Sequence, residues 1–324
     1  MPRELSPGNV VPMLELLTGN DGSRDFVLRR DAIALGIDDN ALARLVKAGE
    51  LVRIRQGAYA PRSRWLASSS RQRHLVLTKA VQAQYDEHVV VSHLSQAIAD
   101  GAPDWGLDLG PVHLTHLVGG GRRAAGIVHH EGSLRVVDVS RSGDGWVTTP
   151  TRTVLDCCNL VTTEVGLVLA NWYLNQGLTT IDELKIRYDE MQRSRRMLAV
   201  RLVLMLADGR IESVGESRFL YLVWRAGLPL PVPQWEVWDG SRLVGTVDFA
   251  WPELGLMVEF DGKVKYGRLL RPGQSAGDAV FAEKRREDEL REITGLRMFR
   301  PVWSDLDRPG LTADRVRRML RSAA

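Results

Sequence analysis

The sequence predicts an α+β protein that is divided into several domains. The prediction rests on the length of 324 residues, on the balance of 44% hydrophobic and 26% charged residues, and on alternating helix-like and strand-like segments. Domains commonly hold about 100–200 residues, so this length accommodates two or three of them. The composition is typical of a globular protein and excludes collagen-like and intrinsically disordered chains.

The sequence has no feature of a membrane-spanning or secreted protein. No run approaches the roughly 18 consecutive apolar residues that a membrane helix needs. Glu4, Pro7 and Asn9 interrupt the start of the chain, where a signal peptide would be apolar. The two cysteines, Cys157 and Cys158, are adjacent and cannot link distant segments. We therefore expect a cytoplasmic protein with no membrane association.

The first domain, residues 1–65, is predicted to contain three short helices and a β-hairpin. Apolar periodicity indicates helices over residues 11–17, 28–35 and 39–48. Asp38 is the expected N-cap of the third helix, and Gly49 is expected to end it. Residues 51–60 alternate around a Gln56–Gly57 turn, which is typical of two short strands. This order predicts a winged helix-turn-helix, whose third helix enters the DNA major groove.

Basic residues are concentrated in this first domain, although the net charge of the chain is only +3. Between residues 41 and 64 there are six basic residues and a single acid, Glu50. DNA phosphates are bound by such local clusters, whatever the net charge of the protein. We expect Arg44 and Lys47 on the third helix, and Arg53 and Arg55 on the hairpin, to contact double-stranded DNA. A solvated basic face is the alternative.

The middle region, residues 74–206, is predicted to be a mixed α/β domain. Strands are expected over residues 89–91 and 112–117, a glycine turn over 119–121, and helices over 150–160, 165–174, 181–191 and 197–206. All seven histidines lie in this region, and five of them lie between residues 93 and 130. His113 and His116 should face opposite sides of their strand, and no histidine or cysteine spacing matches a zinc site. We therefore expect structural or surface roles for these histidines.

The last domain, residues 210–324, is predicted to contain one helix, three strands, a second helix and a fourth strand. These elements are expected over residues 212–226, 234–238, 243–250, 256–261, 278–294 and 296–300. Glu216 lies on the apolar face of the first helix, one turn before Phe219 and Leu220. A carboxylate that points inward should have a cation or a metal ion as its partner.

Pairing the second and third of these strands places acidic residues on one face of the sheet. With residues 252–255 as the loop, the register opposes Ala250 with Met257, Asp248 with Glu259, and Thr246 with Asp261. Lys263 falls on the same face, and the other face should form a core that includes Leu243. Like charges across a ladder are destabilising, and a bound Mg²⁺ would explain their alignment. A solvent-exposed face with diverging acids is the alternative.

The same C-terminal segment resembles the PD-(D/E)XK nucleases, specifically their very-short-patch-repair-like endonucleases. The resemblance covers about 95 residues and rests on Asp248-Phe249, the Pro252 turn, Glu259-x-Asp261-Gly262, Arg286 with Asp288, and the ending from Gly295 to Trp303. It implies a restriction-endonuclease-like αβββαβ domain that hydrolyses DNA with Mg²⁺ or Mn²⁺. It further implies metal ligands at Asp248, Glu259 and Asp261, a helical glutamate at Glu216, and a catalytic lysine at Lys263 or Lys265.

The N-terminal 160 residues resemble a second family, the antitoxins of type IV (abortive-infection) toxin–antitoxin systems. The resemblance rests on the segment 53–59, on Val91-Ser92-His93, and on the segment 148–156. It implies a DNA-binding autorepressor whose partner toxin is a nucleotidyltransferase.

The sequence thus supports three functions of different classes. A metal-dependent endodeoxyribonuclease that is targeted by the winged helix is favoured, because the carboxylates are aligned. The alternative is an antitoxin or transcriptional autorepressor with a catalytically degenerate nuclease fold. The third is an interaction protein whose C-terminal domain binds a partner.

Overall fold

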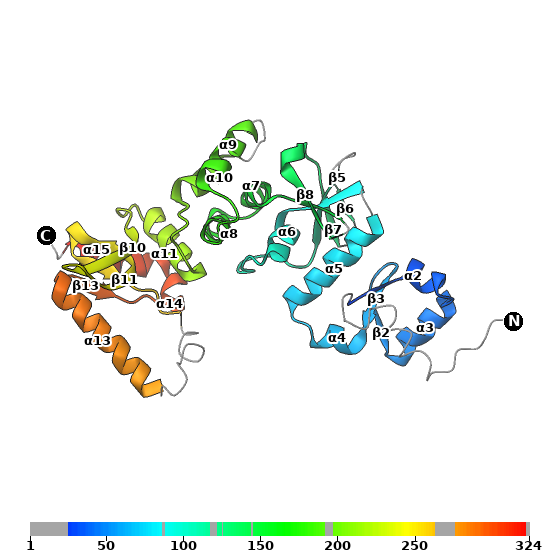
Figure 1. Ribbon diagram of the computed structural model, residues 1–324, viewed down its shortest axis with the longest axis horizontal. Coiled ribbons are helices and arrows are strands. Elements are labelled where there is room, and N and C mark those ends of the chain that lie inside the picture. Colours follow the sequence, from blue (N-terminus) through cyan, green and yellow to red (C-terminus); the bar gives the residue numbers. More distant parts are fainter. Residues whose placement is uncertain are drawn as a thin grey trace. The chain divides into compact units, whose positions relative to one another are not determined.

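The computed structural model describes residues 25–85, 88–116, 122–124, 126–143, 145–191, 197–262 and 276–321. The chain divides into two compact units, Met1–Cys157 and Cys158–Ala324 (Figure 1). This division falls inside the region 74–206, because its sheet belongs to the first unit and its helices at 163–175, 181–191 and 197–206 belong to the second. The expected helix at 11–17, the glycine turn at 119–121, Lys263 and Lys265 lie outside the described residues.

The first unit begins with two short helices and a three-stranded sheet of order β1-β3-β2 (Figure 1). The elements are β1 (Val27–Leu28), α2 (Arg29–Ala34), α3 (Asp39–Ala48), β2 (Leu51–Arg55) and β3 (Ala58–Pro61). The predicted caps of α3 are confirmed: Asp38 Oδ1 accepts a hydrogen bond from the Ala41 N–H at 2.7 Å, and Gly49 ends the helix with φ +83°. Leu42 and Leu51 are buried in the core between α3 and the sheet.

Two further helices connect this small sheet to a larger one. They are α4 (Arg62–Ala67) and α5 (Ser70–Tyr85). Ala80 of α5 packs against Phe26, Leu28 and Ala58. The turn of the hairpin is also attached to α5, because the side-chain amide of Gln84 donates to the carbonyl oxygen of Gln56 at 2.8 Å. The β2–β3 hairpin is therefore braced by the helix behind it.

The larger sheet of the first unit has six strands in the order β6-β7-β5-β4-β9-β8. Its strands are β4 (Val89–Val91), β5 (Val112–His116), β6 (Arg122–Ala124), β7 (Ile127–His130), β8 (Val139–Ser142) and β9 (Gly145–Thr148). Helix α6 (His93–Asp100) follows β4, and a 3₁₀ turn, η3 (Val136–Asp138), precedes β8. Val81 of α5 packs against one face of this sheet, together with Val91 and Leu114. Strands β4 and β9 are parallel, so their C-terminal ends lie at the same edge.

The second unit starts with helices that the sequence predicts within a few residues. They are the end of α7 (Pro150–Leu160), α8 (Thr163–Asn175), α9 (Ile181–Met191) and α10 (Met197–Leu206). Thr162 caps α8 by accepting a hydrogen bond from the Val165 N–H at 3.4 Å. Leu167 of α8 and Val203 of α10 are fully buried. None of the described helices is long and apolar enough to cross a membrane.

A four-stranded sheet of order β10-β11-β12-β13 forms the rest of the second unit. Its elements are α11 (Val214–Arg225), β10 (Val232–Asp239), β11 (Arg242–Trp251), η4 (Pro252–Leu254), β12 (Leu256–Val258), α13 (Ala276–Thr294), β13 (Arg297–Phe299), α14 (Trp303–Leu306) and α15 (Pro309–Arg321). The predicted order of one helix, three strands, a helix and a strand is present. Helices α14 and α15 were not predicted.

Both faces of this sheet are covered by helices. Phe219 of α11 contacts Phe249 and Phe299, with ring centroids 5.6 and 6.3 Å apart. Leu290 of α13 packs with Ala250 and Met257. One core expectation is wrong: Leu243 is 46% exposed. The register shifts at the end of the β10–β11 hairpin, which is where Leu243 pairs with Trp238.

Candidate functional site

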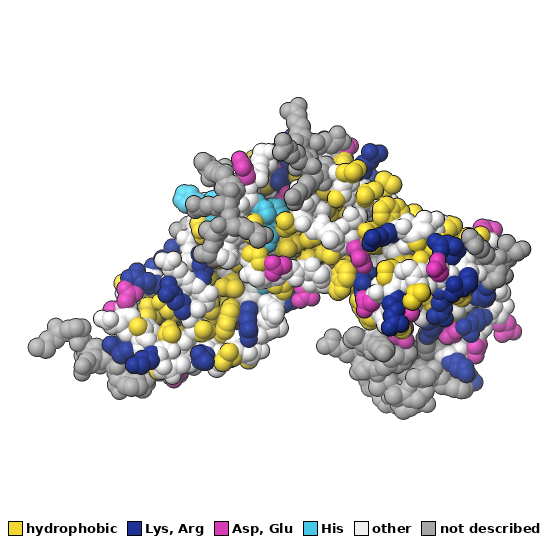
Figure 2. All heavy atoms as spheres, turned by 180° about the vertical axis from the view of Figure 1, so that it is seen from behind, with side chains coloured by type: hydrophobic (Ala, Val, Ile, Leu, Met, Phe, Trp, Pro, Cys, Tyr) yellow, Lys and Arg dark blue, Asp and Glu magenta, His cyan; other side chains and the backbone are white. Residues whose placement is uncertain are grey.

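Helix α3 presents an exposed polar stripe on the side opposite its core residue Leu42. Asn40, Ala43, Arg44 and Lys47 are all exposed, and their spacing of three and four residues places them on one helix face. Amide, guanidinium and ammonium groups are the side-chain groups that bind DNA base edges and phosphates. Patches of Lys and Arg side chains are visible on the N-terminal unit at the left of Figure 2. The stripe is therefore a candidate DNA-contacting surface.

The two hairpin arginines differ in their surroundings. Arg53 is exposed, whereas Arg55 is half-buried. A register shift between them interrupts the alternation that would place both side chains on the same side of the strand. The Nε atom of Arg55 is buried and has no hydrogen-bond partner among the described residues. Arg53 is therefore the better placed of the two to contact a phosphate.

Five histidines of the middle region form two groups, one on each face of the six-stranded sheet. Nδ1 of His113 lies 2.8 Å from Nε2 of His130, and the His130 ring stacks on His93 with centroids 3.5 Å apart. On the other face, Nε2 of His116 lies 2.5 Å from Nδ1 of His129. The predicted opposition of His113 and His116 is confirmed. Within the described ranges, no three His, Cys, Asp or Glu side chains form a group that could hold a metal ion.

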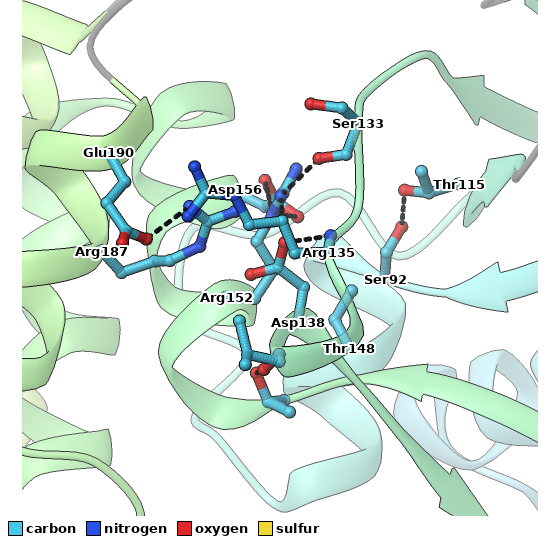
Figure 3. Close-up of polar contacts among 12 residues, drawn as sticks. Ser92, Thr115, Ser133, Arg135, Asp138, Thr148, Arg152, Asp156, Arg187 and Glu190 are labelled. Atoms are coloured by element: carbon cyan, nitrogen blue, oxygen red, sulfur yellow. Dashed lines mark hydrogen bonds and ion pairs between the residues drawn. The ribbon is translucent and has the colours of Figure 1, made fainter.

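A buried ionic network lies where β4 and β9 end. Arg152 of α7 donates from Nε to both carboxylate oxygens of Asp156 at 2.9 Å and from Nη1 to Asp138 at 3.1 Å (Figure 3). Burial raises the pKa of Asp156, and the charge of Arg152 opposes this shift. His93 Nδ1 is 3.9 Å from Asp156, and burial, with a smaller effect of Arg152, lowers the pKa of His93 to about 3. The network is enclosed, so we assign it a structural role.

In the second unit, Asp248 and Glu259 lie next to each other at the end of the β11–β12 ladder. The observed pairs Ala250–Met257 and Phe249–Val258 confirm the first part of the predicted register. The ladder ends one pair short of the predicted Asp248–Glu259 pair. Instead, Asp248 Oδ2 accepts a hydrogen bond from the Phe260 N–H at 2.6 Å. The Asp248 carboxylate therefore reaches the backbone directly beside Glu259.

Glu259 is held by two arginines. Its Oε2 lies 2.8 Å from Nη2 of Arg300, which follows β13, and its Oε1 pairs with Arg286 of α13. Arg300 also contacts Glu287 at 3.1 Å. Arginine forms strong charge-assisted hydrogen bonds to carboxylates and keeps its charge at all ordinary pH values. These arginines supply the positive charge that the sequence analysis assigned to a metal ion.

The expected partner of Glu216 is corrected by the structure. Glu216 is buried, as predicted, but its Oε2 accepts hydrogen bonds from the Glu212 N–H at 3.0 Å and from the Gln234 side-chain amide at 3.2 Å. Both donors are uncharged. A carboxylate can be satisfied in this way because hydrogen bonds to backbone and amide N–H groups also compensate for its lost hydration.

Gln234 is a residue of this site that the sequence analysis missed. It stands between the Pro233–Phe249 and Trp235–Val247 pairs, which is the position opposite Asp248. Its φ of +48° lies in the left-handed region that non-glycine residues seldom adopt. Strained residues of this kind are concentrated at functional sites. Gln234 thus connects the Glu216 carboxylate with the strand that carries Asp248.

Asp261 is not placed in the predicted ladder. Thr246, its expected partner, pairs with Glu236, and Asp261 forms an isolated parallel bridge with Val302. The Asp261 N–H donates to the carbonyl oxygen of Pro301 at 2.9 Å. The cause is that β12 ends at Val258, so the chain leaves β11 before it reaches Asp261.

Glu259, one of the three predicted metal ligands, is already paired with cations in the arrangement described. Mg²⁺ needs carboxylate oxygens that it can ligate directly, and those of Glu259 are both paired with arginine. A divalent ion at Glu259 would therefore compete with Arg286 and Arg300 for these oxygens. The described side chains are instead suited to holding the ends of β12 and β13 together.

Part of the first unit is similar to a known protein family. Residues 21–62 match the family model described as "Transcriptional regulator, AbiEi antitoxin". This segment contains α2, α3 and the β2–β3 hairpin, including Arg44, Lys47, Arg53 and Arg55.

Two curated relatives are also similar to this chain. They are the uncharacterized proteins MT2308 and Rv2248 of Mycobacterium tuberculosis, from strains CDC 1551 / Oshkosh and ATCC 25618 / H37Rv. Each is 35% identical over 135 residues, which is 41% of this chain and 46% of the relative. The chain thus spans about half the length of the curated relatives that it matches.

Proposed function

We propose that this protein is a DNA-binding transcriptional regulator of the antitoxin type and that α3 is its DNA-contacting helix. The observation that carries the proposal is the exposed stripe of Asn40, Arg44 and Lys47 on a well-capped helix. The match of residues 21–62 to the antitoxin regulator family supports the same segment. The order of α2, α3 and the hairpin supports a winged helix-turn-helix, a motif whose recognition helix enters the major groove.

The proposed partners follow from this role. Double-stranded DNA is the primary one, and regulation of its own promoter is the activity typical of an antitoxin. A nucleotidyltransferase toxin is the corresponding protein partner, as the resemblance to type IV antitoxins implies. The braced hairpin would add a phosphate contact through Arg53, because that side chain is exposed.

The experiment is a fluorescence-anisotropy titration of the full chain on duplex DNA from upstream of its own gene, at several salt concentrations. Replacing Arg44 and Lys47 together by alanine should weaken binding and reduce the salt slope by about two phosphate contacts. The matched control removes two exposed basic residues elsewhere, Lys185→Ala with Arg201→Ala. Equal affinities and salt slopes for the two double variants would contradict the assignment of α3.

Metal-dependent hydrolysis of DNA by the C-terminal domain is the second candidate function. The neighbouring positions of Asp248 and Glu259 favour it, as does the strand order of that domain. Its test is nicking of supercoiled plasmid with Mg²⁺ or Mn²⁺, comparing the wild type with Asp248→Ala and Glu259→Ala. Nicking by the wild type and its loss in both variants would support an endonuclease. If the wild type does not nick the plasmid, the role as a transcriptional regulator is the one candidate function that remains.

A further inference from the structure

A cavity of about 430 Å³ in the N-terminal unit lies apart from the exposed stripe of α3. It is bounded by Asp25 and Phe26, by the end of α4, and by one face of α5. Figure 1 shows α4 and α5 as consecutive helices. No residue of α3 or of the β2–β3 hairpin lines it. Ligand pockets commonly measure about 300–1,000 Å³, so this cavity is large enough for a small organic molecule.

The inner wall of the cavity is apolar. Phe26 is buried, and Leu75 and Val76 are half-buried beside it. On α5, these two apolar residues lie between the polar residues Gln72 and Lys79, at the spacing of one helix face. A molecule in the cavity would therefore have an apolar body along the middle of this face.

The rim of the cavity carries more positive than negative charge. Among the described residues that line it, Arg64 and Lys79 are the cations and Asp25 is the single acid. The Arg64–Asp25 pair is long, at 3.4 Å, and both side chains are about half exposed, so the pair is weak. Lys79 is exposed and has no ion-pair partner in the part of the chain that the structure describes. Both cations are therefore available to an anionic group.

We propose that this cavity binds a small organic anion, a carboxylate or sulfonate attached to an apolar or aromatic body. The apolar body would contact Phe26, Leu75 and Val76, and the anionic group would contact Lys79 and Arg64. Ser68 supplies a polar group on the same rim. The cavity thus combines an apolar wall with polar groups on its rim, and polar groups of this kind fix the orientation of a ligand in small-molecule sites. This inference does not depend on the proposed DNA contacts.

The experiment uses the full chain and two fluorescent probes of similar shape. The anionic probe is 8-anilinonaphthalene-1-sulfonate, and the uncharged one is N-phenyl-1-naphthylamine. The wild type should bind the anionic probe saturably, at one site, and more tightly than the uncharged probe. Lys79→Gln and Arg64→Gln should each lower the affinity for the anionic probe by about fivefold, which is the upper range for an exposed ion pair. Neither should change the affinity for the uncharged probe.

The matched control is Lys185→Gln, which removes an exposed lysine from α9. It should bind both probes as the wild type does, and melting temperatures should show that all variants are folded. Loss of affinity in the control equal to that in Lys79→Gln would overturn the proposal, because it would indicate nonspecific binding. Equal affinity of the wild type for the two probes, or binding that does not saturate, would overturn it as well.

Discussion

Arg300 and Glu259 form an ion pair at the end of two parallel strands, with Nη2 of the arginine 2.8 Å from Oε2 of the glutamate. Glu259 directly follows β12, and Arg300 directly follows β13. The Glu259 N–H also donates to the carbonyl oxygen of Phe299 at 3.1 Å. Since parallel strands bring their C-terminal ends to the same edge, a side chain after one can reach a side chain after the other. The acidic site therefore contains its own cations.

Replacing Arg286 by alanine tests whether these cations stand where a metal ion would bind. The change leaves one oxygen of a largely buried Glu259 without its arginine, so the free energy of unfolding should fall by about 1–2 kcal/mol without metal. A divalent cation could then replace the lost charge. We expect Mg²⁺ to raise the melting temperature of Arg286→Ala more than that of the wild type.

The control for this prediction is Arg242→Ala. Arg242 also contacts α13, through Glu289 at 2.6 Å, but both side chains are well exposed. Exposed ion pairs contribute little, so this variant should lose less than about 1 kcal/mol and should respond to Mg²⁺ as the wild type does. Equal Mg²⁺ responses of all three proteins would mean that Glu259 is not a latent metal ligand.

Gly215 fixes the first turn of α11 against the strand end that carries this site. A Cβ atom added to Gly215 would lie 2.0 Å from the ring of Phe260, so the ring or the helix would have to move. Gly215→Ala should therefore destabilise the protein by about 1–3 kcal/mol, as overpacking of a core does. Gly310→Ala is the matched control, because no atom lies within 4 Å of its added Cβ. Urea denaturation compares the two, and equal midpoints would contradict the close packing.

Local signals explain which elements the sequence predicted. The N-cap Asp38 and the terminal Gly49 set the ends of α3 through contacts within a few residues. The β11–β12 register followed from a short loop, so Ala250 and Met257 were paired correctly. Four strands of the six-stranded sheet were not predicted, because each of β6 to β9 has only three or four residues and little alternation.

Nonlocal contacts explain what the sequence could not provide at the candidate site. Arg300 reaches Glu259 from 41 residues away, and only the parallel pairing of β12 with β13 brings them together. Gln234 contacts Glu216 from a left-handed backbone position inside a strand. Neither relationship has a period or spacing that a single sequence reveals. The acidic residues were found from their pattern, but their partners were not.

The buried Arg152 network should be essential for the stability of the first unit. Arg152→Met keeps the length of the side chain and removes the charge, which leaves Asp138 and Asp156 buried without their cation. Breaking a buried ion pair in this way costs about 3–5 kcal/mol. The control is Arg141→Met, since Arg141 is exposed and stacks on Trp146 at 4.5 Å. Equal losses of stability in thermal or urea unfolding would contradict the role assigned to Arg152.

His93 begins α6 in surroundings that oppose its protonation. It is buried, its ring stacks on His130, and its φ is +50°. Besides His130, the charged and titratable groups that the described residues place near it are Asp156 at 3.9 Å, Arg152, and His113, whose ring centroid is 6.1 Å away. Burial is the main cause that lowers the pKa of His93 to about 3, and Arg152 adds to it.

Acid should therefore destabilise the folded protein through His93. Between the unfolded pKa of about 6.5 and the folded pKa of about 3, the unfolded state binds one proton more at this residue, so stability falls as pH falls. The loss from pH 7 to pH 5 should be about 2 kcal/mol. Asparagine tolerates a left-handed backbone, so it suits this position. Between pH 7 and pH 5, His93→Asn should lose about 2 kcal/mol less stability than the wild type does, as measured by urea denaturation. His88→Asn replaces an exposed histidine and should behave as the wild type does at both pH values. If His93→Asn keeps the full pH dependence, another group causes it.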